Sequence, residues 1–447
     1  MTSISKLTDA LLSAAIKAGA ESADAIATEG RSVSIEVREG ALEHAERAEG
    51  VDIGLRVLIG KRQAIVSASD ASDATVAEMA ERAVAMAEIA PEDPHIGLAE
   101  PDQLAKTWDL AALDLIEDAP EPAPADMQAA AVEAEAVALK NSGVSQVQSA
   151  ATSYTRSAIH IAATNGFSGG YERSSHGLYC VAISGTGPDM ERDHYGEGRI
   201  YHADLPTPEY VGTEAARRAV ERAGARKPKT GAYPVLYDER IAAGLIGHLL
   251  QAANGASVAR GSSWLRERLG EQVLPTTLSI NENPHRPRIS GSKPFDAEGL
   301  PTRPRDIVKD GVLQGWTLDL ATACQLGMES TASAARGTSS PPSPSMTNIA
   351  LTQGDQTRDD LIRDMGTGLL VTSMIGSTIS PTTGDYSRGA SGFWVENGEI
   401  TFPVNECTIA GNLHDMLRRI QPANDARTHL SRVVPSLLVE GMTLAGE

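Results

Sequence analysis

Alternation of apolar and polar residues in the first part of the chain is the feature that most constrains its fold. In 31-RSVSIEVREG-40, Val33, Ile35 and Val37 alternate with Ser, Glu and Arg, as in a strand with one buried and one solvated face. The segment 51-VDIGLRVLIGKRQAIVSAS-69 predicts two more strands joined at a tight turn. An amphipathic helix over 4–19 precedes these strands, and a helix over 74–89, capped by Asp73, follows them. This order predicts an α+β fold.

The same order of elements then recurs. We expect a helix over about 126–141, strands over 144–151, 154–164, 170–174 and 177–184, and a helix over about 207–224. The Pro/Glu-rich stretch 117-EDAPEPAPAD-126 predicts a linker or an exposed corner. After residue 226, short strand-like runs separated by turn residues predict a β-rich half, with a helix over 240–254 near its start. We therefore expect an N-terminal α+β part (1–116), a second, similar α+β part (117–225), both with antiparallel sheets, and a β-rich C-terminal domain (226–447).

Charge, cysteine content and hydropathy exclude several classes of protein. The formal net charge is −20, which disfavours nucleic-acid binding, because a phosphate-binding surface needs clustered Lys and Arg. Cys180, Cys324 and Cys407 are odd in number and far apart, so a disulfide framework and an all-thiolate zinc site are disfavoured, and a cytoplasmic location is expected. The N-terminal helix does not have the pattern of a signal peptide, and no run of about 18 apolar residues predicts a membrane span.

The helix around 241-IAAGLIGHLLQA-252 carries a single histidine, His248. A zinc-protease helix of the H-E-x-x-H type needs a second imidazole one turn later and a glutamate beside the first. Here the corresponding residues are Leu249 and Ala252, which are both apolar. We therefore expect His248 to be a packed helix residue with one imidazole hydrogen bond.

Two further motifs favour structural explanations. The stretch 166-GFSGG-170 fits G-x-S-x-G around Ser168, but a nucleophile elbow must be followed by a helix, and β-like sequence follows here. A glycine-rich hairpin turn explains the pattern better. Asp296 and Glu298 in 294-PFDAEG-299 are too few for a calcium loop, so a solvated turn is expected.

Two polar loops are candidates for binding a ligand. The stretch 335-ARGTSSPPSPSMTN-348, which includes Ser343, is typical of a linker, although substrate-contacting loops have similar compositions. Asp385, Tyr386, Ser387 and Arg388 lie between glycines, where they can either bind a peptide backbone or carboxylate or tie the loop together by hydrogen bonds. Both interpretations stay open, and the residues by themselves assemble no catalytic constellation.

Five stretches of the sequence resemble a known family. They are 50-GVDIGLRVLIGKRQA-64, 165-NGFSGG-170, 295-FDAEGLPT-302, 336-RGTSSPPSPSMTN-348 and 384-GDYSRGASGFWVENGEITFPVNECTIAGNL-413. Through them the chain resembles the TldD/PmbA metallopeptidase family from about residue 20 to 445, and specifically its PmbA (TldE) branch. The resemblance implies a cytoplasmic protein that forms a heterodimer with a TldD-type subunit. In such a pair the TldD subunit holds zinc and cleaves short or unfolded peptides.

The resemblance also implies that the zinc motif of the TldD branch is degenerate in this chain. That motif is H-E-x-x-x-H on a helix, with a further cysteine ligand near the C-terminus. When 260-RGSSW-264 is aligned with the corresponding TldD loop, the motif positions fall on Ile246, Gly247 and Gln251, and no cysteine follows Cys407. Ile246 has no lone pair to donate and Gly247 has no side chain to act as a base, so no metal ligand is expected here.

We therefore expect a non-catalytic subunit with no cofactor of its own and zinc in its partner. Its expected partners are a TldD-type chain, a second copy of itself and an unfolded peptide; nucleic acid and membrane are not expected. Asp385, Tyr386, Ser387, Arg388 and Ser343 are the candidate substrate-binding residues. Two alternatives remain open: a self-sufficient serine hydrolase that uses Ser168, and a regulatory protein of the DNA gyrase modulator type without a peptidase role.

Overall fold

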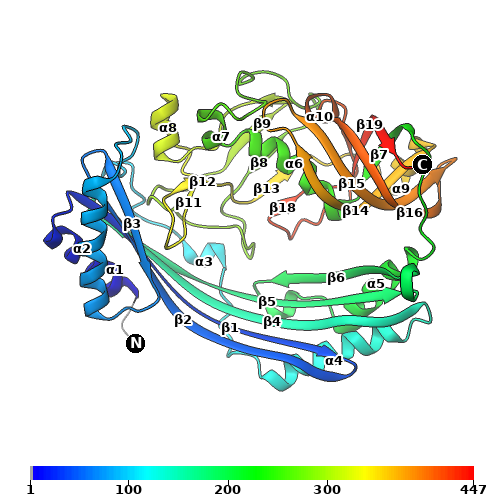
Figure 1. The fold of residues 1–447 in the computed structure, drawn as a ribbon, viewed down its shortest axis with the longest axis horizontal. Helices are drawn as coiled ribbons and strands as arrows, with labels where there is room; N and C mark the ends of the chain where they lie inside the picture. Colours follow the sequence, from blue (N-terminus) through cyan, green and yellow to red (C-terminus); the bar gives the residue numbers. More distant parts are fainter. Residues whose placement is uncertain (1–3) are drawn as a thin grey trace.

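The computed structural model describes residues 4–447, and the N-terminal half of the chain forms one long curved antiparallel sheet (Figure 1). The strand order is β3-β2-β1-β4-β5-β6. The strands are β1 (Ser22–Arg38), β2 (Ala41–Ile59), β3 (Arg62–Ala68), β4 (Val144–Ala163), β5 (Ser168–Ser184) and β6 (Glu191–Arg199). Because β1 pairs with β4 along 14 residue pairs, from Asp24↔Ala163 to Val37↔Ala150, the two predicted α+β parts share a single sheet.

Two strands are longer than the sequence pattern predicts. The predicted strands 144–151 and 154–164 are one strand, β4, and 170–174 and 177–184 both belong to β5. Ser153, Thr155 and Ser157 continue the pairing of β4 with both of its neighbours. The middle of this sheet carries small polar residues, so the apolar alternation that reveals a strand is weak there.

Helices cover one face of this sheet at its two ends. The first pair is α1 (Ile4–Ala18) and α2 (Asp73–Ile89), and the second pair is α4 (Pro124–Leu139) and α5 (Pro208–Glu221). The first pair packs on Ala23, Ala25 and Ala27 of β1, and the second packs on Val33, Ile35 and Val37. These six are alternate positions of one strand, so both pairs lie on the same face. The predicted helix bounds are confirmed within a few residues, but Ser72 and not Asp73 caps α2.

The C-terminal half is built on a β-barrel. Six strands pair in the order β16-β15-β14-β7-β19-β17, and a further pairing of β16 with β19 closes the sheet. They are β7 (Gly231–Tyr237), β14 (Gly368–Ile379), β15 (Asp385–Glu396), β16 (Glu399–Asn412), β17 (Gln421–Pro422) and β19 (Leu437–Ala445). The helix α6 (Glu239–Ala252) packs its apolar side into the main core of this domain. At the predicted β15–β16 turn, Asn397 and Gly398 both have positive φ, as a type I′ hairpin turn requires.

Shorter elements complete the domain. A second sheet has the order β10-β9-β8-β13-β18, and β11 pairs with β12. The remaining strands are β8 (Ile280–Glu282), β9 (Arg305–Lys309), β10 (Val312–Leu313), β11 (Ala334–Ala335), β12 (Ser343–Pro344), β13 (Ile349–Leu351) and β18 (Arg432–Val433). The remaining helices are α3 (Leu110–Leu113), α7 (Gly255–Ala259), α8 (Leu320–Leu326), α9 (Arg358–Met365) and α10 (Leu413–Leu417), and the short 3₁₀ turns are Gly187–Asp189 and His202–Asp204. The expected α+β fold with a β-rich C-terminal domain is confirmed.

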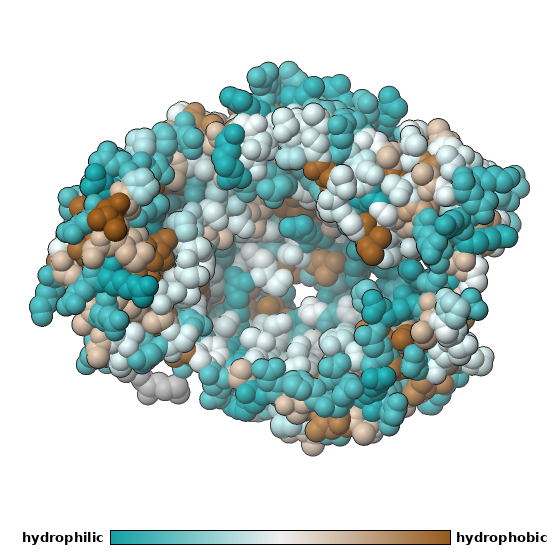
Figure 2. Space-filling model, in the orientation of Figure 1, coloured by the Kyte–Doolittle hydropathy of each residue, from teal (hydrophilic) through white to brown (hydrophobic). Residues whose placement is uncertain are grey.

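The two halves touch at both ends of the curved sheet and leave a hollow between them. At one end, β11 and β12 lie against the sheet, and at the other end β6 and α5 lie below the barrel (Figure 1). Figure 2 shows the hollow, which is open right through the molecule in this view. Among the helices of residues 4–447, none combines the length and apolar character needed to cross a bilayer.

Candidate functional site

The helix α6 has one buried and one open side. Leu245, Ile246, Leu249 and Leu250 are at most 2% exposed and belong to the core of the C-terminal domain. Half-exposed or exposed positions on the other side include Gly244, Gly247, His248 and Gln251, which we call the open face of α6. They are spaced i, i+3, i+4 and i+7, so they form one stripe along the helix.

The open face does not fit a zinc ion. Of the three degenerate motif positions, Gly247 and Gln251 lie on the open face and Ile246 points into the core. His248 is therefore the single residue on this face of a type that zinc prefers, and one imidazole is too few, because protein zinc sites use three or four such ligands. Within residues 4–447, no group of three or more His, Cys, Asp or Glu side chains is arranged to hold a metal ion.

His248 packs against Tyr386 of β15. Their ring centroids are 5.8 Å apart and the rings meet edge to face at 71°. Burial and the nearby positive charge of Arg388 both lower the pKa of His248, so its imidazole is neutral at pH 7. The expected packing is confirmed, but the expected hydrogen bond is not found: the buried Nε2 atom has no partner within residues 4–447. This ring nitrogen is therefore both buried and unpaired beside Tyr386.

The four candidate residues at the start of β15 point to two sides. Tyr386 and Arg388 both face α6, because alternate residues of a strand share a side, and Tyr386 is 2% exposed. Asp385 is exposed and accepts hydrogen bonds from Thr383 Oγ1 (2.6 Å) and Asn412 Nδ2 (3.0 Å). These two bonds lower the pKa of Asp385 and tie the turn before β15 together. The geometry therefore places only Tyr386 and Arg388 of this group beside the open face.

The 335–348 loop is a packed part of the structure, so its interpretation as a linker is wrong. It forms the β11–β12 hairpin, in which Ser343 is exposed and its hydroxyl lies 3.5 Å from the carbonyl of Ala335. The Asn254 side chain, just after α6, donates a 2.8 Å hydrogen bond to the carbonyl of Pro344. Ser343, on β12, is thus near the C-terminal end of α6.

The tip of this loop is anchored in the N-terminal sheet by buried charges that the sequence did not reveal. Asp24 of β1 forms ion pairs with Arg56 of β2 and with Arg336 of the loop; we call these three residues the Asp24 cluster. Asp24 and Arg56 are both 4% exposed, and the Arg336 side chain is fully buried. Burial alone would raise the pKa of Asp24, but Arg336 and Arg56 hold it below its ordinary value. No local pattern connects three residues so far apart in the chain.

Asp296 and Glu298 are also not in a solvated turn, so that prediction is wrong. Asp296 is 1% exposed and accepts backbone hydrogen bonds from Glu298, Leu300 and Ala334. Glu298 accepts one from Leu320. Burial and the neighbouring carboxylate of Asp296 raise the pKa of Glu298 well above its usual range. The two carboxylates accept backbone hydrogen bonds that hold the segment before β11 and the start of α8 in place.

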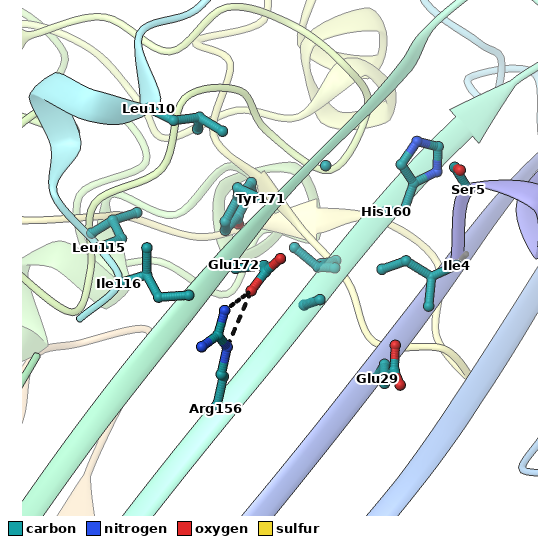
Figure 3. A pocket seen from close by; sticks show the side chains of 13 residues that line it. Ile4, Ser5, Glu29, Leu110, Leu115, Ile116, Arg156, His160, Tyr171 and Glu172 are labelled. Carbon is teal, nitrogen blue, oxygen red and sulfur yellow. Dashed lines mark hydrogen bonds and ion pairs between the residues drawn. The ribbon is translucent and has the colours of Figure 1, made fainter. Parts of the chain in front are cut away.

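A cavity of about 610 Å³ lies on the helix-bearing face of the N-terminal sheet, between α1 and α3 (Figure 3). Arg156 and Glu172 form an ion pair on its floor, at 2.8 Å. Nearby, the hydroxyl of Ser168 is 3.5 Å from Nε2 of His160. This pairing was missed in the sequence, where His160 belongs to a different strand.

The Ser168 pairing does not have the parts of a serine hydrolase. His160 Nδ1 is 2.8 Å from the hydroxyl of Thr8, where a catalytic histidine is held by a carboxylate. Ser168 is the first residue of β5, so the strand–turn–helix context of a nucleophile elbow is absent here. The hairpin interpretation of 166–170 therefore fits the structure.

Comparison with known proteins identifies the family. Three models of one group of metallopeptidases match the chain: PmbA/TldA metallopeptidase domain 1 at residues 23–87, the central domain at 115–223 and the C-terminal domain at 230–446. Together they cover most of the sequence, from the first long strand to the last. The chain belongs to the PmbA/TldD metallopeptidase family.

Individual relatives point to the PmbA branch. The chain is 37% identical to the metalloprotease PmbA of Escherichia coli O157:H7, over 93% of this chain and 90% of that protein. It is 36% identical to a PmbA homologue of Haemophilus influenzae, over 97% of this chain and 94% of that protein. By contrast, the TldD homologue of Haemophilus influenzae is 29% identical over only 47% of this chain.

Solved structures show the same fold along the whole chain. TldE of Thermococcus kodakarensis has a TM-score of 0.85 and 20% identity, and the match covers 98% of this chain and 100% of that one. A protein of Bacteroides thetaiotaomicron described as a putative modulator of DNA gyrase has a TM-score of 0.90 and 24% identity, covering both chains completely. At these identities the likeness concerns the fold.

Proposed function

We propose that this chain is the non-catalytic subunit of a zinc metallopeptidase heterodimer that cleaves short or unfolded peptides in the cytoplasm. The observation that carries this proposal is the open face of α6. A member of a metallopeptidase family keeps the helix, while Ile246, Gly247 and Gln251 provide no zinc ligand or general base. A TldD-type partner would supply the zinc ion and the water that it activates.

The role of this chain is then to bind and orient an extended peptide. Residues 41–52 of β2 pair with β1 on one side, and within residues 4–447 no strand pairs with their other side, since β3 begins its pairing at Ile53. A free strand edge can bind a peptide main chain by strand addition, independent of its sequence. The hollow in Figure 2 lies between the two halves of the molecule, and we infer that an extended chain would enter it more easily than a folded protein. This arrangement supports a preference for unfolded substrates.

Side chains beside the hollow would add contacts to the peptide. Arg388 and Ser343 are the candidate residues near α6 that can make such contacts, while Tyr386 is buried and would act by supporting its neighbours. Asp385 and Ser387 point to the other side of β15, so their contribution would be to the shape of the strand and not to direct contact. We also retain a homodimer as a possible state, because related subunits share interface surfaces.

Reconstitution tests the proposal. The chain and a TldD-type chain from the same genome are purified separately, zinc is counted per chain, and cleavage of an unfolded peptide is measured for each chain alone and for the mixture. We expect zinc in the partner, a stable complex, and faster cleavage by the complex than by the partner alone, with loss of activity after chelation. Stoichiometric zinc in this chain, with chelator-sensitive cleavage by it alone, would overturn the proposal.

The same experiment separates the alternatives. A serine hydrolase predicts cleavage by the isolated chain that resists chelators and is lost in Ser168→Ala. A gyrase modulator without a peptidase role predicts binding to gyrase and no complex with the TldD-type chain. Either result would replace the proposal with the corresponding alternative.

A further inference from the structure

The open face of α6 has free space that packing does not require. A Cβ atom added to Gly244 would meet no atom within 4 Å, and one added to Gly247 would meet only Nη1 of Arg432, at 3.5 Å. Glycine inside a helix costs about 1 kcal/mol relative to alanine. Neither glycine is needed for a close approach of the neighbouring chain, so packing does not explain why both positions lack a side chain.

Two guanidinium groups reach this face from different sheets. Arg388 comes from β15, and its Nε donates a 2.7 Å hydrogen bond to the carbonyl of Gly376, which fixes the plane of the group. Arg432 comes from β18 and is exposed. Within residues 4–447, neither the terminal nitrogens of Arg388 nor any side-chain nitrogen of Arg432 makes a hydrogen bond or ion pair. In contrast, Arg427 of the same loop as Arg432 is paired with Glu239.

The local charge is positive, although the chain as a whole carries −20. His248 follows Gly247, the position at which an added Cβ would lie 3.5 Å from Nη1 of Arg432, and burial and the charge of Arg388 lower the pKa of His248. No carboxylate contributes to that shift in the opposite direction. The face therefore carries two guanidinium groups that make no ion pair within residues 4–447, beside a neutral imidazole whose Nε2 is buried and unpaired.

We propose that the open face of α6 is a carboxylate-binding site for a peptide, at the place where the family's catalytic subunit would hold a metal ion. This inference rests on the proposed function and deepens it by naming what part of the peptide is recognised. A guanidinium matches the two oxygens of a carboxylate with parallel hydrogen bonds.

A peptide offers such a group in two ways: its C-terminal carboxylate or the side chain of Asp or Glu. The test measures the binding of three short fluorescein-labelled peptides to the isolated chain by anisotropy. One is a Gly/Ser/Ala peptide with a free C-terminus, the second is its C-terminal amide, and the third is the amide with one Glu near its end. We expect the free acid to bind about tenfold more tightly than the amide. Tight binding of the third peptide would assign the side chain as a source as well.

Variants and a spectroscopic measurement assign the effect to this face. The preference for the acid should disappear in Arg388→Gln and Arg432→Gln, return partly in Arg388→Lys, and stay in the matched control Arg82→Gln, an exposed arginine on α2. Bound carboxylate should also raise the pKa of His248 in an NMR titration, assigned with His248→Gln. Equal or absent binding of all three peptides, or an equal loss in Arg82→Gln, would overturn the inference. Because no partner is used, this result is separate from the cleavage test of the proposed function.

Discussion

Removing Asp24 should destabilise this protein more than removing either arginine that it binds. In the Asp24 cluster, one carboxylate compensates two buried guanidinium groups, and Arg56 Nε lies 2.7 Å from Asp24 Oδ2. Asp24→Ala removes the one carboxylate that is ion-paired with both buried cations, and Glu298 and Asp319 act on Arg56 only through longer-range charge. Breaking a buried ion pair by removing one partner costs about 3–5 kcal/mol.

Arg336→Met should lower the free energy of unfolding less than Asp24→Ala does. The Asp24–Arg56 pair remains after this substitution, so no charge is left uncompensated. Nε and Nη2 of Arg336 have no hydrogen-bond partner within the described chain, so the substitution also removes two buried donors that are already unsatisfied. Methionine keeps much of the apolar volume of the arginine stem. We therefore expect a cost of about 1–2 kcal/mol.

Calorimetry measures the difference. Unfolding entropy near 60 °C is about 2.1 cal/mol/K per residue, which gives roughly 0.9 kcal/mol/K for this chain. If the chain unfolds as one unit, Asp24→Ala lowers Tm by about 3–5 °C and Arg336→Met by about 1–2 °C. Glu46→Ala, an exposed acid on the same sheet, is the control and should change stability by less than about 0.5 kcal/mol.

The pH dependence gives a second check on the same residue. The pKa of Asp24 is lower in the folded chain than in the unfolded chain, so its ionisation stabilises the fold above the unfolded pKa of about 4. That contribution is lost as the pH falls below this value through the folded pKa. The Tm difference between wild type and Asp24→Asn should therefore shrink on acidification below pH 4. If Arg336→Met costs as much as Asp24→Ala at pH 7, uncompensated charge is not what governs this contact.

Three further substitutions test other parts of the structure. Gly54→Ala would place a Cβ 2.1 Å from the carbonyl oxygen of Thr338, so it should lower the free energy of unfolding by about 1–3 kcal/mol and expose the 335–348 loop to limited proteolysis. Gly50→Ala on the same strand has open space around it and should do neither. Equal proteolysis of the two variants would contradict the docking of the loop. Ser168→Ala should leave peptide cleavage by the reconstituted pair unchanged, and a loss above about tenfold would revive a catalytic role for the pairing with His160. Burial raises the pKa of Glu298, so its ionisation destabilises the fold as the pH rises from the unfolded pKa towards the folded one. Glu298→Gln should therefore raise Tm more at pH 8 than at pH 5. A larger rise at pH 5 would show that the pKa of Glu298 is not raised by folding.

The sequence predicted local structure well where the period was clear. The helices of the N-terminal half and the Asn397-Gly398 turn follow from amphipathic spacing and turn chemistry, and the structure confirms them. The long strands β4 and β5 were divided, because Ser153, Thr155 and their neighbours on the sheet are polar on both faces. A period-two signal needs one apolar face, and the middle of this sheet has none.

The ion pairs between residues far apart in the chain could not be predicted from the sequence. The loop around Arg336 has the composition of a linker, and its anchor Asp24 is 312 residues away in the chain. Asp296 and Glu298 were taken for solvated residues because acidic residues in a Gly-containing turn usually are. Their burial depends on β11 and on the segment around Leu320 closing over them. Only the fold brings these partners together, so no local pattern could indicate them.

The buried side of α6 is held by core packing and its open face is not, and this difference leads to a last prediction. Leu245, Leu249 and Leu250 hold the helix in the core, where truncating a buried leucine costs about 2–5 kcal/mol, so the helix persists without any metal. Gly244 and Gly247 have no such support: alanine fits at both positions and should stabilise the helix by about 1 kcal/mol each. If their space serves a ligand, Gly244→Ala together with Gly247→Ala should raise Tm by calorimetry and weaken binding of the free-acid peptide. A gain in stability with unchanged peptide affinity would show that the space beside the two glycines does not hold the peptide.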